Sequence, residues 1–209
     1  KCKDKFVCIH LPILMDYDNM IARSLEPNCM DDEKEIIKIL SVGRLVGLKG
    51  FHLCVEPCKR LIDEGFNVKW YVAGEGDYRH VIEALIKKHH LENNFILLGN
   101  CPNPYSYIRS ADICVQPSSY EGFSLSVIEG KFFKKAMVVS NIPSNTEMIK
   151  DGYNGLIVER NSDEIQRAVK RLVQDEDLRK RLGETPSLVE ISTKKVMQEF
   201  ENLFLELLN

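Results

Sequence analysis

The sequence contains no apolar run of the ~18 residues that a membrane-spanning helix needs. It also lacks an excess of positive charge, because 28 Lys and Arg stand against 31 Asp and Glu, for a formal net charge of -3. This balance argues against a nucleic-acid-binding protein that acts through a basic face. The 7 cysteines have irregular spacing and are an odd number, which fits reduced thiols better than a disulfide framework. We therefore expect a cytoplasmic protein.

Apolar residues make up 44% of the 209 residues and charged residues 28%, which is ordinary usage for a protein with a hydrophobic core. At roughly 150 residues per domain, the length indicates one large domain, or one domain with a tail. Residues 15–34 are polar and are predicted to form a loop. We assign residues 1–35 to a lead-in segment and residues 36–209 to one domain that ends in a helix. Because the chain begins at Lys1 and not at Met, we expect a further segment upstream.

From residue 36 onward, β-branched apolar runs alternate with stretches of helical periodicity. This pattern is typical of a parallel sheet covered by helices on both faces. The sequence predicts an α/β fold with a Rossmann-like, doubly wound parallel sheet of about six strands. The predicted strands are 36–43, 68–74, 95–99, 112–118, 136–140 and 155–159, and the predicted helices are 49–64, 77–91, 105–110, 124–135, 143–150, 162–174, 176–183 and 193–208.

The loops that follow the predicted strands are rich in glycine, hydroxyl groups, carboxylates and cations. In an open parallel sheet, ligands bind beyond the carboxyl ends of the strands, where loops lead into helix N-termini. Because these loops all meet at one edge of the sheet, that edge is the predicted ligand site. The loops are 43–50, 74–76, 99–104, 117–124 and 140–147.

Two cations and two carboxylates in these loops are candidates for ligand contacts. Arg44 and Lys49, with the backbone N–H groups of 122–125 at a helix N-terminus, could surround a diphosphate. Glu121 and Glu129 could accept hydrogen bonds from different hydroxyls of a polyol. Taken alone, Arg44 and Lys49 could equally be solvated surface cations, and an isolated pair such as Glu121 and Glu129 is more often a loop carboxylate and a solvated helix position. Their shared strand–loop–helix register favours a ligand site.

Five segments together resemble a known family. They are GRL..KG at 43–50, VAGEG at 72–76, LGN at 98–100, ADICVQPSSYEGFSLSVIE at 111–129 and DGYNGLIV at 151–158. In this order they resemble the retaining GT-B glycosyltransferases of the group 1 type, family GT4, over residues 36–183. The resemblance implies that residues 36–209 are the C-terminal, nucleotide-sugar-binding half of a two-domain enzyme. It also implies a missing N-terminal acceptor-binding domain, no metal or other cofactor, and little or no transfer by this half alone.

The resemblance also implies roles for individual residues. Arg44 and Lys49 would hold the diphosphate and stabilise its charge as it leaves, and Glu121 would contact the hydroxyls of the donor sugar. Glu129 would bind the ribose hydroxyls. The remaining donor-binding positions are backbone or base contacts: Gly43, Gly74 to Gly76, Asn100, Cys101, Pro102, Gly122, Phe123, Ser124 and Leu125.

The sequence departs from the family pattern at three places. Ser124 stands where the family commonly has Gly. Residues 130–136, GKFFKKA, stand where the family usually has small residues followed by Gly and Pro, so the turn into the fifth strand must be made without that Gly and Pro. A common Gly pair is replaced by Ser144 and Asn145.

Several other motifs have a simpler interpretation. Asp16-Tyr17-Asp18 imitates a metal-binding D-x-D motif but lies in the predicted loop. Cys54 and Cys58, one helical turn apart, are interpreted as core residues. The basic stretches KFFKK and RAVKRLVQDEDLRKRLG could make weak contact with the inner face of a membrane, although ordinary helix surfaces also explain them. GEGDYR at 74–79 is a near miss to a dinucleotide fingerprint, which leaves an NAD-type domain as one alternative and a stand-alone nucleotide-sugar-binding module as another.

Overall fold

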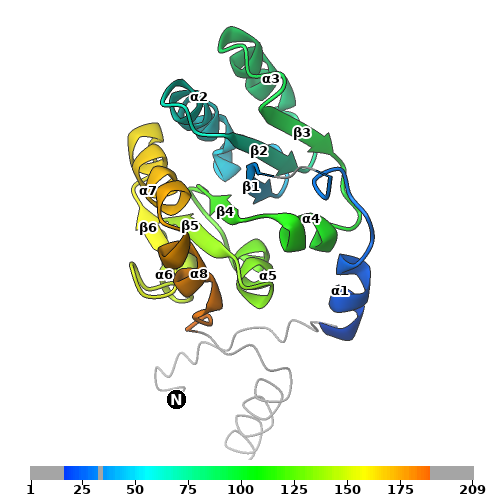
Figure 1. Ribbon diagram of the computed structural model, residues 1–209, viewed down its shortest axis with the longest axis vertical. Coiled ribbons are helices and arrows are strands. Elements are labelled where there is room, and N and C mark those ends of the chain that lie inside the picture. Colours follow the sequence, from blue (N-terminus) through cyan, green and yellow to red (C-terminus); the bar gives the residue numbers. More distant parts are fainter. Residues whose placement is uncertain (1–16, 33–34, 189–209) are drawn as a thin grey trace, which may run out of the picture.

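Figure 1 shows the protein as a computed structural model, which describes residues 17–32 and 35–188. Six parallel strands lie in the order β3-β2-β1-β4-β5-β6. This order reverses between β1 and β4, as in doubly wound nucleotide-binding sheets. The predicted fold is therefore confirmed. The strands are β1 (Ile37–Val42), β2 (Val68–Ala73), β3 (Phe95–Gly99), β4 (Ile113–Gln116), β5 (Ala136–Ser140) and β6 (Leu156–Val158).

Helices cover both faces of the sheet (Figure 1). The α-helices are α1 (Tyr17–Ser24), α2 (Val55–Asp63), α3 (Arg79–Lys88), α4 (Tyr105–Ser110), α5 (Leu125–Phe132), α6 (Pro143–Thr146), α7 (Ser162–Gln174) and α8 (Glu176–Glu184). Two short 3-10 helices, η1 (Gly47–Lys49) and η2 (Phe51–Cys54), precede α2.

The two faces of the sheet build separate cores, because successive side chains of a strand point to opposite sides. On β2, Trp70 joins the core formed with α2, α3 and α7, whereas Tyr71 joins the core formed with α4 and α5. Cys54 and Cys58 are fully buried in the first core, so their interpretation as packing residues is confirmed. Burial raises the pKa of the Cys58 thiol to about 12.

The prediction of a loop over 15–34 is wrong for Tyr17–Ser24, which form α1. The sequence of this helix is mostly polar, and its stability comes from tertiary packing. Met20 is buried, the Tyr17 and Phe132 rings have centroids 4.9 Å apart, and α1 lies against α4. Tyr17 and Asp18 of the D-x-D motif therefore begin a helix. Asp16, the apolar stretch 6–14 and the predicted helix 193–208 lie outside the described residues.

The single helix predicted over 49–64 is wrong in its first turns. Gly50 adopts φ 74°, and a Cβ at this position would collide with the carbonyl oxygen of Pro117. This left-handed residue divides η1 from η2, so α2 begins only at Val55. The break turns η1 toward the loop after β4, which brings Lys49 to the edge of the sheet.

The turn into β5 is made without the usual glycine and proline. Lys134 takes the left-handed conformation at φ 55°, and Lys135 N–H donates to the carbonyl of Gly130. Lys131 is buried, and its ammonium donates to the carbonyls of Asn154, Leu182 and Gly183 at 2.9, 2.5 and 3.2 Å. Burial lowers the pKa of Lys131 to about 8. Lys131 is therefore a core residue, so this lysine of the KFFKK stretch lies neither on an ordinary helix surface nor where lipid could contact it.

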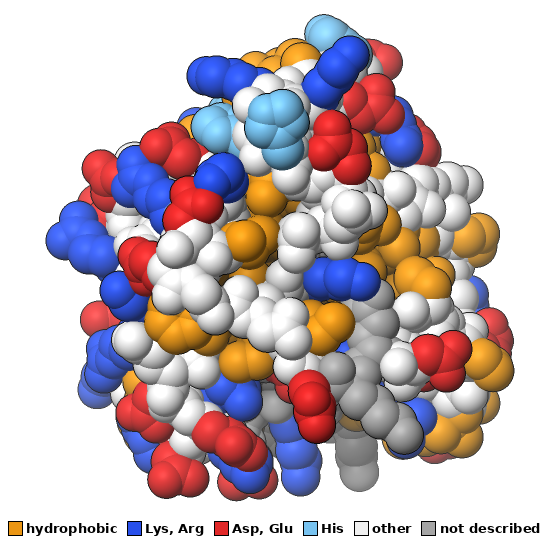
Figure 2. Space-filling view, turned by 45° about the horizontal axis from the view of Figure 1, so that its top comes forward, with side chains coloured by type: hydrophobic (Ala, Val, Ile, Leu, Met, Phe, Trp, Pro, Cys, Tyr) orange, Lys and Arg blue, Asp and Glu red, His pale blue; other side chains and the backbone are white. Residues whose placement is uncertain are grey.

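The surface carries charges of both signs. Figure 2 shows basic and acidic side chains interspersed around the rim of one face, with mainly uncharged atoms nearer its middle. This mixture agrees with the sequence, in which 28 Lys and Arg stand against 31 Asp and Glu. Within residues 17–32 and 35–188, no helix combines the length and apolar character that crossing a bilayer would require.

Candidate functional site

A hollow of about 260 Å³ lies at the carboxyl ends of β1, β2 and β3. Its walls come from three consecutive strand ends: Val42, Gly43, Arg44, Ala73, Gly74, Glu75, Asn100, Cys101 and Pro104. Gly74 has φ 153°, and a Cβ there would overlap the carbonyl oxygen of Gly43. The close approach of the two strand ends therefore depends on glycine.

An ion pair lies beside this hollow, at the switch point between β1 and β4. The Lys49 ammonium is 2.5 Å from Glu121 Oε1, and the two side chains are 21% and 12% exposed. The stem of Lys49 passes over Gly43, where a Cβ would stand 3.3 Å from Lys49 Cε. Gly43 thus gives Lys49 its path to Glu121 and joins the ion pair to the wall of the hollow.

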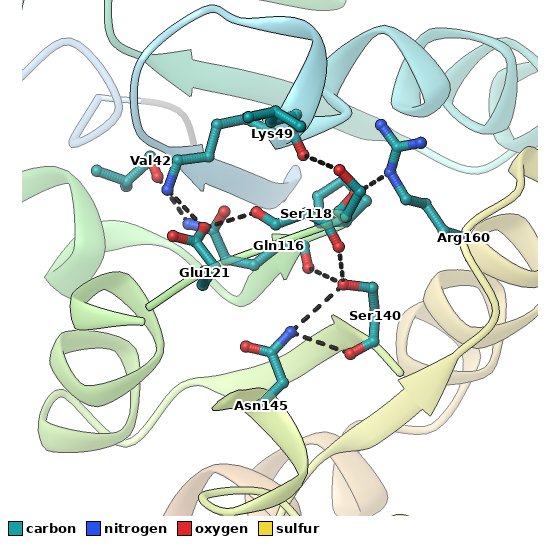
Figure 3. A network of polar contacts seen from close by, with 11 residues as sticks. Val42, Lys49, Gln116, Ser118, Glu121, Ser140, Asn145 and Arg160 are labelled. Atoms are coloured by element: carbon teal, nitrogen blue, oxygen red, sulfur yellow. Dashed lines mark hydrogen bonds and ion pairs between the residues drawn. The ribbon is translucent and has the colours of Figure 1, made fainter. Parts of the chain in front are cut away.

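A series of hydrogen bonds between buried polar groups fixes the position of Glu121 (Figure 3). Ser118 Oγ donates to Glu121 Oε1 at 2.7 Å, and Ser140 Oγ donates to the carbonyl of Ser118. The amide of Asn145 donates to the carbonyl oxygen and the hydroxyl of Ser140 at 3.0 and 3.4 Å. Gln116 on β4 donates to the carbonyl of Val42 on β1 at 2.8 Å. These bonds connect the end of β1 with the end of β4 and with the loops after β4 and β5.

Arg160, which follows β6, fastens the η1 segment to the loop after β4 (Figure 3). Its Nε donates to the carbonyl of Pro117 at 3.0 Å and its Nη2 to the carbonyl of Gly47 at 2.8 Å. Ser119 N–H donates to the carbonyl of Leu48 at 2.8 Å. The segments that carry Lys49 and Glu121 are therefore held together before any ligand arrives.

Helix α5 begins at the same edge, with Ser124 as its N-cap. The Ser124 side chain caps no backbone N–H, and its buried hydroxyl has no partner among the described residues. An uncapped helix N-terminus presents a positive dipole end to an anion. At this one, the N–H groups of Leu125 and Val127 already donate to the carbonyls of Phe123 and Ser124 at 3.2 and 3.1 Å. The positive dipole end suits the phosphate contacts that the sequence predicts at 122–125.

The two cations predicted to contact a diphosphate differ in their surroundings. Arg44 is exposed on the wall of the hollow, and no described residue pairs with it. Lys49, by contrast, is already paired with Glu121. The structure thus brings Arg44, Lys49 and Glu121 to one edge, the two cations from the segment after β1 and the carboxylate from the loop after β4.

The other predicted site residues divide into three groups. Gly43, Gly74, Asn100 and Cys101 line the hollow, and Gly76 lies next to it, where a Cβ would collide with the carbonyl oxygen of Leu45. Gly122, Phe123, Ser124 and Leu125 lead into α5, with Gly122 and Leu125 exposed and Ser124 buried. Pro102 is exposed and is not part of the wall of the hollow, whereas Pro104, which the sequence analysis did not select, is part of it.

Sequence reasoning missed the polar groups that hold the site in place, namely Gln116, Ser118, Ser140, Asn145 and Arg160. Each follows or ends a strand at the predicted ligand edge, and that position was the available signal. Arg160 lies two residues after the GLIV segment of the last strand. The other four are buried, and a sequence does not reveal which buried polar groups bond to one another.

Glu129 lies on α5 and is half-buried, and its carboxyl has no hydrogen-bond partner among the described residues. Burial alone raises the pKa of its carboxyl from 4.5 to about 7. Strongly perturbed carboxylates near a cleft are candidates for ligand contacts.

The contribution of Glu129 to the free energy of unfolding should fall as pH rises from about 4.5 to about 7, because folded Glu129 keeps a proton that the unfolded chain has already released. Glu129→Gln should remove this part of the pH dependence. Urea unfolding midpoints across that range measure it. Glu184→Gln, an exposed position at the end of α8, is the control and should keep the original slope. An unchanged slope in Glu129→Gln would show that another group is responsible.

Among residues 17–32 and 35–188, no group of three or more His, Cys, Asp or Glu side chains is placed to hold a metal ion. The GEGDYR segment at 74–79, the near miss to a dinucleotide fingerprint, takes part in a local network of ion pairs. Arg79, at the position of the third glycine of a dinucleotide fingerprint, contacts Glu75 at 2.5 Å and Glu83 at 2.7 Å.

Comparison with known proteins gives a consistent result. A family model described as glycosyl transferases group 1 matches residues 30–186. An N-acetylgalactosamine-N,N'-diacetylbacillosaminyl-diphospho-undecaprenol 4-alpha-N-acetylgalactosaminyltransferase of Campylobacter jejuni is 33% identical over 168 residues, which cover 79% of this chain and 44% of that protein.

Solved structures share the fold. A crystal structure of TarM from S. aureus in complex with fondaparinux, alpha-GlcNAc-glycerol and UDP aligns with a TM-score of 0.72 and 25% identity, over 82% of this chain and 36% of that one. A crystal structure of the C-terminal domain of a group 1 glycosyl transferase (LpcC) from Francisella tularensis aligns with a TM-score of 0.67 and 24% identity, over 78% of this chain and 85% of that one. The chain spans about a third to a half of the curated relatives it matches, with values of 53%, 34% and 44%.

Proposed function

The chain belongs to the group 1 glycosyltransferases, and from that premise we propose that it binds the nucleotide-sugar donor of a retaining, metal-independent enzyme. The proposal rests above all on the Lys49–Glu121 ion pair at 2.5 Å beside the hollow. This pair sets a phosphate-binding cation next to a sugar-binding carboxylate at the switch point of the sheet. The presence of UDP in the TarM structure supports a nucleoside diphosphate as the leaving group.

The proposed chemistry follows the charge. As the bond between the anomeric carbon and the phosphate oxygen breaks, its electron pair goes to the diphosphate. Arg44, Lys49 and the N-terminus of α5 stabilise this charge without having to rearrange, because the loops that carry them are already fastened. The acceptor oxygen bonds to the anomeric carbon on the face that the diphosphate leaves, and the acceptor proton goes to the departing phosphate oxygen. Glu121 stabilises the positive charge that develops on the sugar.

The ribose and the base of the donor contact side chains for which no hydrogen bond to another described residue is formed. Glu129 accepts hydrogen bonds from the ribose hydroxyls, and the base lies against the wall formed by Asn100 and Cys101. The acceptor is bound by a separate N-terminal domain, so this half alone transfers little or nothing. The group 1 membership supports this reading over an NAD-type domain.

Calorimetric titration with UDP, GDP and ADP tests the donor site directly. We expect at least one nucleoside diphosphate to bind with micromolar affinity, in the absence of a divalent cation and with EDTA present. Uridine alone should bind much more weakly, because it lacks the charge that Arg44 and Lys49 stabilise. If none of the three nucleotides binds, the chain is not a donor-binding domain.

Incubation of the chain with UDP-sugars tests the second part of the proposal. Little or no UDP should be released by this chain alone. The stand-alone binding module makes the same prediction for this chain, but it differs once the upstream coding sequence is expressed. A longer chain that transfers sugar identifies the enzyme, whereas the absence of any upstream domain favours the binding module.

A further inference from the structure

Helix α1 and the turn that follows it, residues 17–32, hold one wall of the hollow. That wall is the loop 100–104 between β3 and α4, in which Asn100, Cys101 and Pro104 face the hollow. Figure 1 shows α1 at the margin of the domain, and its contacts with α4 place it beside this loop. Helix α1 belongs to the segment predicted as a structureless lead-in.

The loop has almost no backbone bonds of its own. None of the described backbone–backbone hydrogen bonds outside helices and strands involves residues 100–103. Pro102 and Pro104 have no N–H to donate. The position of the loop must therefore come from side-chain contacts with neighbouring segments.

Helix α1 supplies these contacts in both directions. Arg23 Nη2 donates to the carbonyl of Pro102 at 2.6 Å. In return, the Asn103 amide donates to the carbonyl of Arg23 at 2.9 Å and to Glu26 Oε2 at 2.7 Å. The Arg23 guanidinium also lies 5.5 Å from the centre of the Tyr105 ring. Arg23 thus contacts the loop at Pro102 and also contacts Tyr105, the first residue of α4.

A second set of bonds fixes the turn after α1 to α4. Asn28 donates to the carbonyl of Ser106 at 3.2 Å and to Ser110 Oγ at 3.0 Å. Ser110 Oγ donates to Asp31 Oδ1 at 2.6 Å. Because α4 follows the loop directly, these bonds anchor the far end of the same wall.

We propose that residues 17–32 form a clamp that positions the loop 100–104 and thereby sets the affinity and selectivity of the site for the nucleotide base. This inference rests on the proposed function, because it assigns the base to the wall of the hollow. Arg23 and Asn103 are positioning residues that act through the loop. The diphosphate contacts lie on other loops, so the clamp affects the base-dependent part of binding alone.

The test compares UDP with inorganic pyrophosphate, which has no base. Arg23→Ala and, separately, Asn103→Ala should weaken UDP binding about tenfold, the equivalent of one or two hydrogen bonds, and should leave pyrophosphate binding unchanged. The ratio of UDP to GDP affinity should also move toward one, because both bases lose the same wall. Arg23→Lys, which keeps the charge and one donor to Pro102, should recover part of the loss. Arg167→Ala, which removes an exposed arginine of α7, is the matched control.

The outcomes separate the two levels of the proposal. If UDP and pyrophosphate weaken by the same factor, or if UDP binding does not change, the clamp does not position the base. If the unsubstituted chain binds no nucleoside diphosphate, the proposed function is wrong as well. Circular dichroism melts of each variant identify a general loss of folding, and the single substitution Asn103→Ala tests the loop without altering α1.

Discussion

Replacing both Arg44 and Lys49 with alanine is expected to weaken UDP binding by about 100-fold or more. Under the proposed function, each cation makes a charge-assisted hydrogen bond to the diphosphate, and such bonds contribute about 1.5–3 kcal/mol each. Lys49→Ala alone should cost more than Arg44→Ala. It also leaves Glu121, which is 12% exposed, without its 2.5 Å partner, so an unpaired negative charge faces the phosphates.

Titration calorimetry of the two single variants and of the double variant measures this effect. The matched control is the double substitution of Lys59 and Arg60 on α2, which removes the same charge from exposed ion pairs with Asp63, Glu56 and Asp163. That control should change UDP affinity less than about twofold, because exposed ion pairs contribute little and are screened by salt. Equal losses in both double variants would mean that UDP senses net charge and not these two side chains.

Gly74→Ala is expected to lower the free energy of unfolding by about 3–5 kcal/mol. The new Cβ would collide with the carbonyl oxygen of Gly43, which is backbone and cannot rotate away, and φ 153° is itself strained for alanine. Backbone strain of this kind costs about 1–3 kcal/mol and overpacking adds a similar amount. Urea unfolding followed by circular dichroism measures the loss.

Gly65→Ala separates the two causes. Gly65 also has a positive φ, of 88°, but no atom lies within 4 Å of the position that its Cβ would take. This variant should lose about 1 kcal/mol, from backbone strain alone. If both variants lose the same amount, the close approach of the β1 and β2 ends is not what requires glycine at position 74.

Repeated local patterns made the sheet predictable. Each strand is a short apolar run followed by glycine or polar residues, and this pattern located all six strands, the edge where Arg44, Lys49 and Glu121 meet, and the start of α5 close to Ser124. These features depend on residues that are close together in the sequence, so the sequence alone is enough to predict them.

What the sequence did not reveal depends on contacts between distant segments. Helix α1 has few apolar residues, and its partners are about 80 residues away in the chain, as the bond from Arg23 to Pro102 shows. The sequence suggests that Lys131 is a surface cation. In the structure it is buried, and its ammonium donates to three carbonyls from two other segments. The hydrogen bonds that run from Asn145 through Ser140 to Ser118 similarly join residues whose partners are known only from the folded structure.

The anchoring of Glu121 has a stereochemical consequence. Lys49 and Ser118 both bond to its Oε1 atom, and no donor from the described residues reaches Oε2. A carboxylate held at one oxygen cannot rotate, so the other oxygen points in a fixed direction. Under the proposed function, a sugar whose hydroxyl projects toward Oε2 gains a hydrogen bond that its epimer cannot form. Discrimination between epimers would then originate in Ser118 and Lys49, neither of which has to touch the sugar ring.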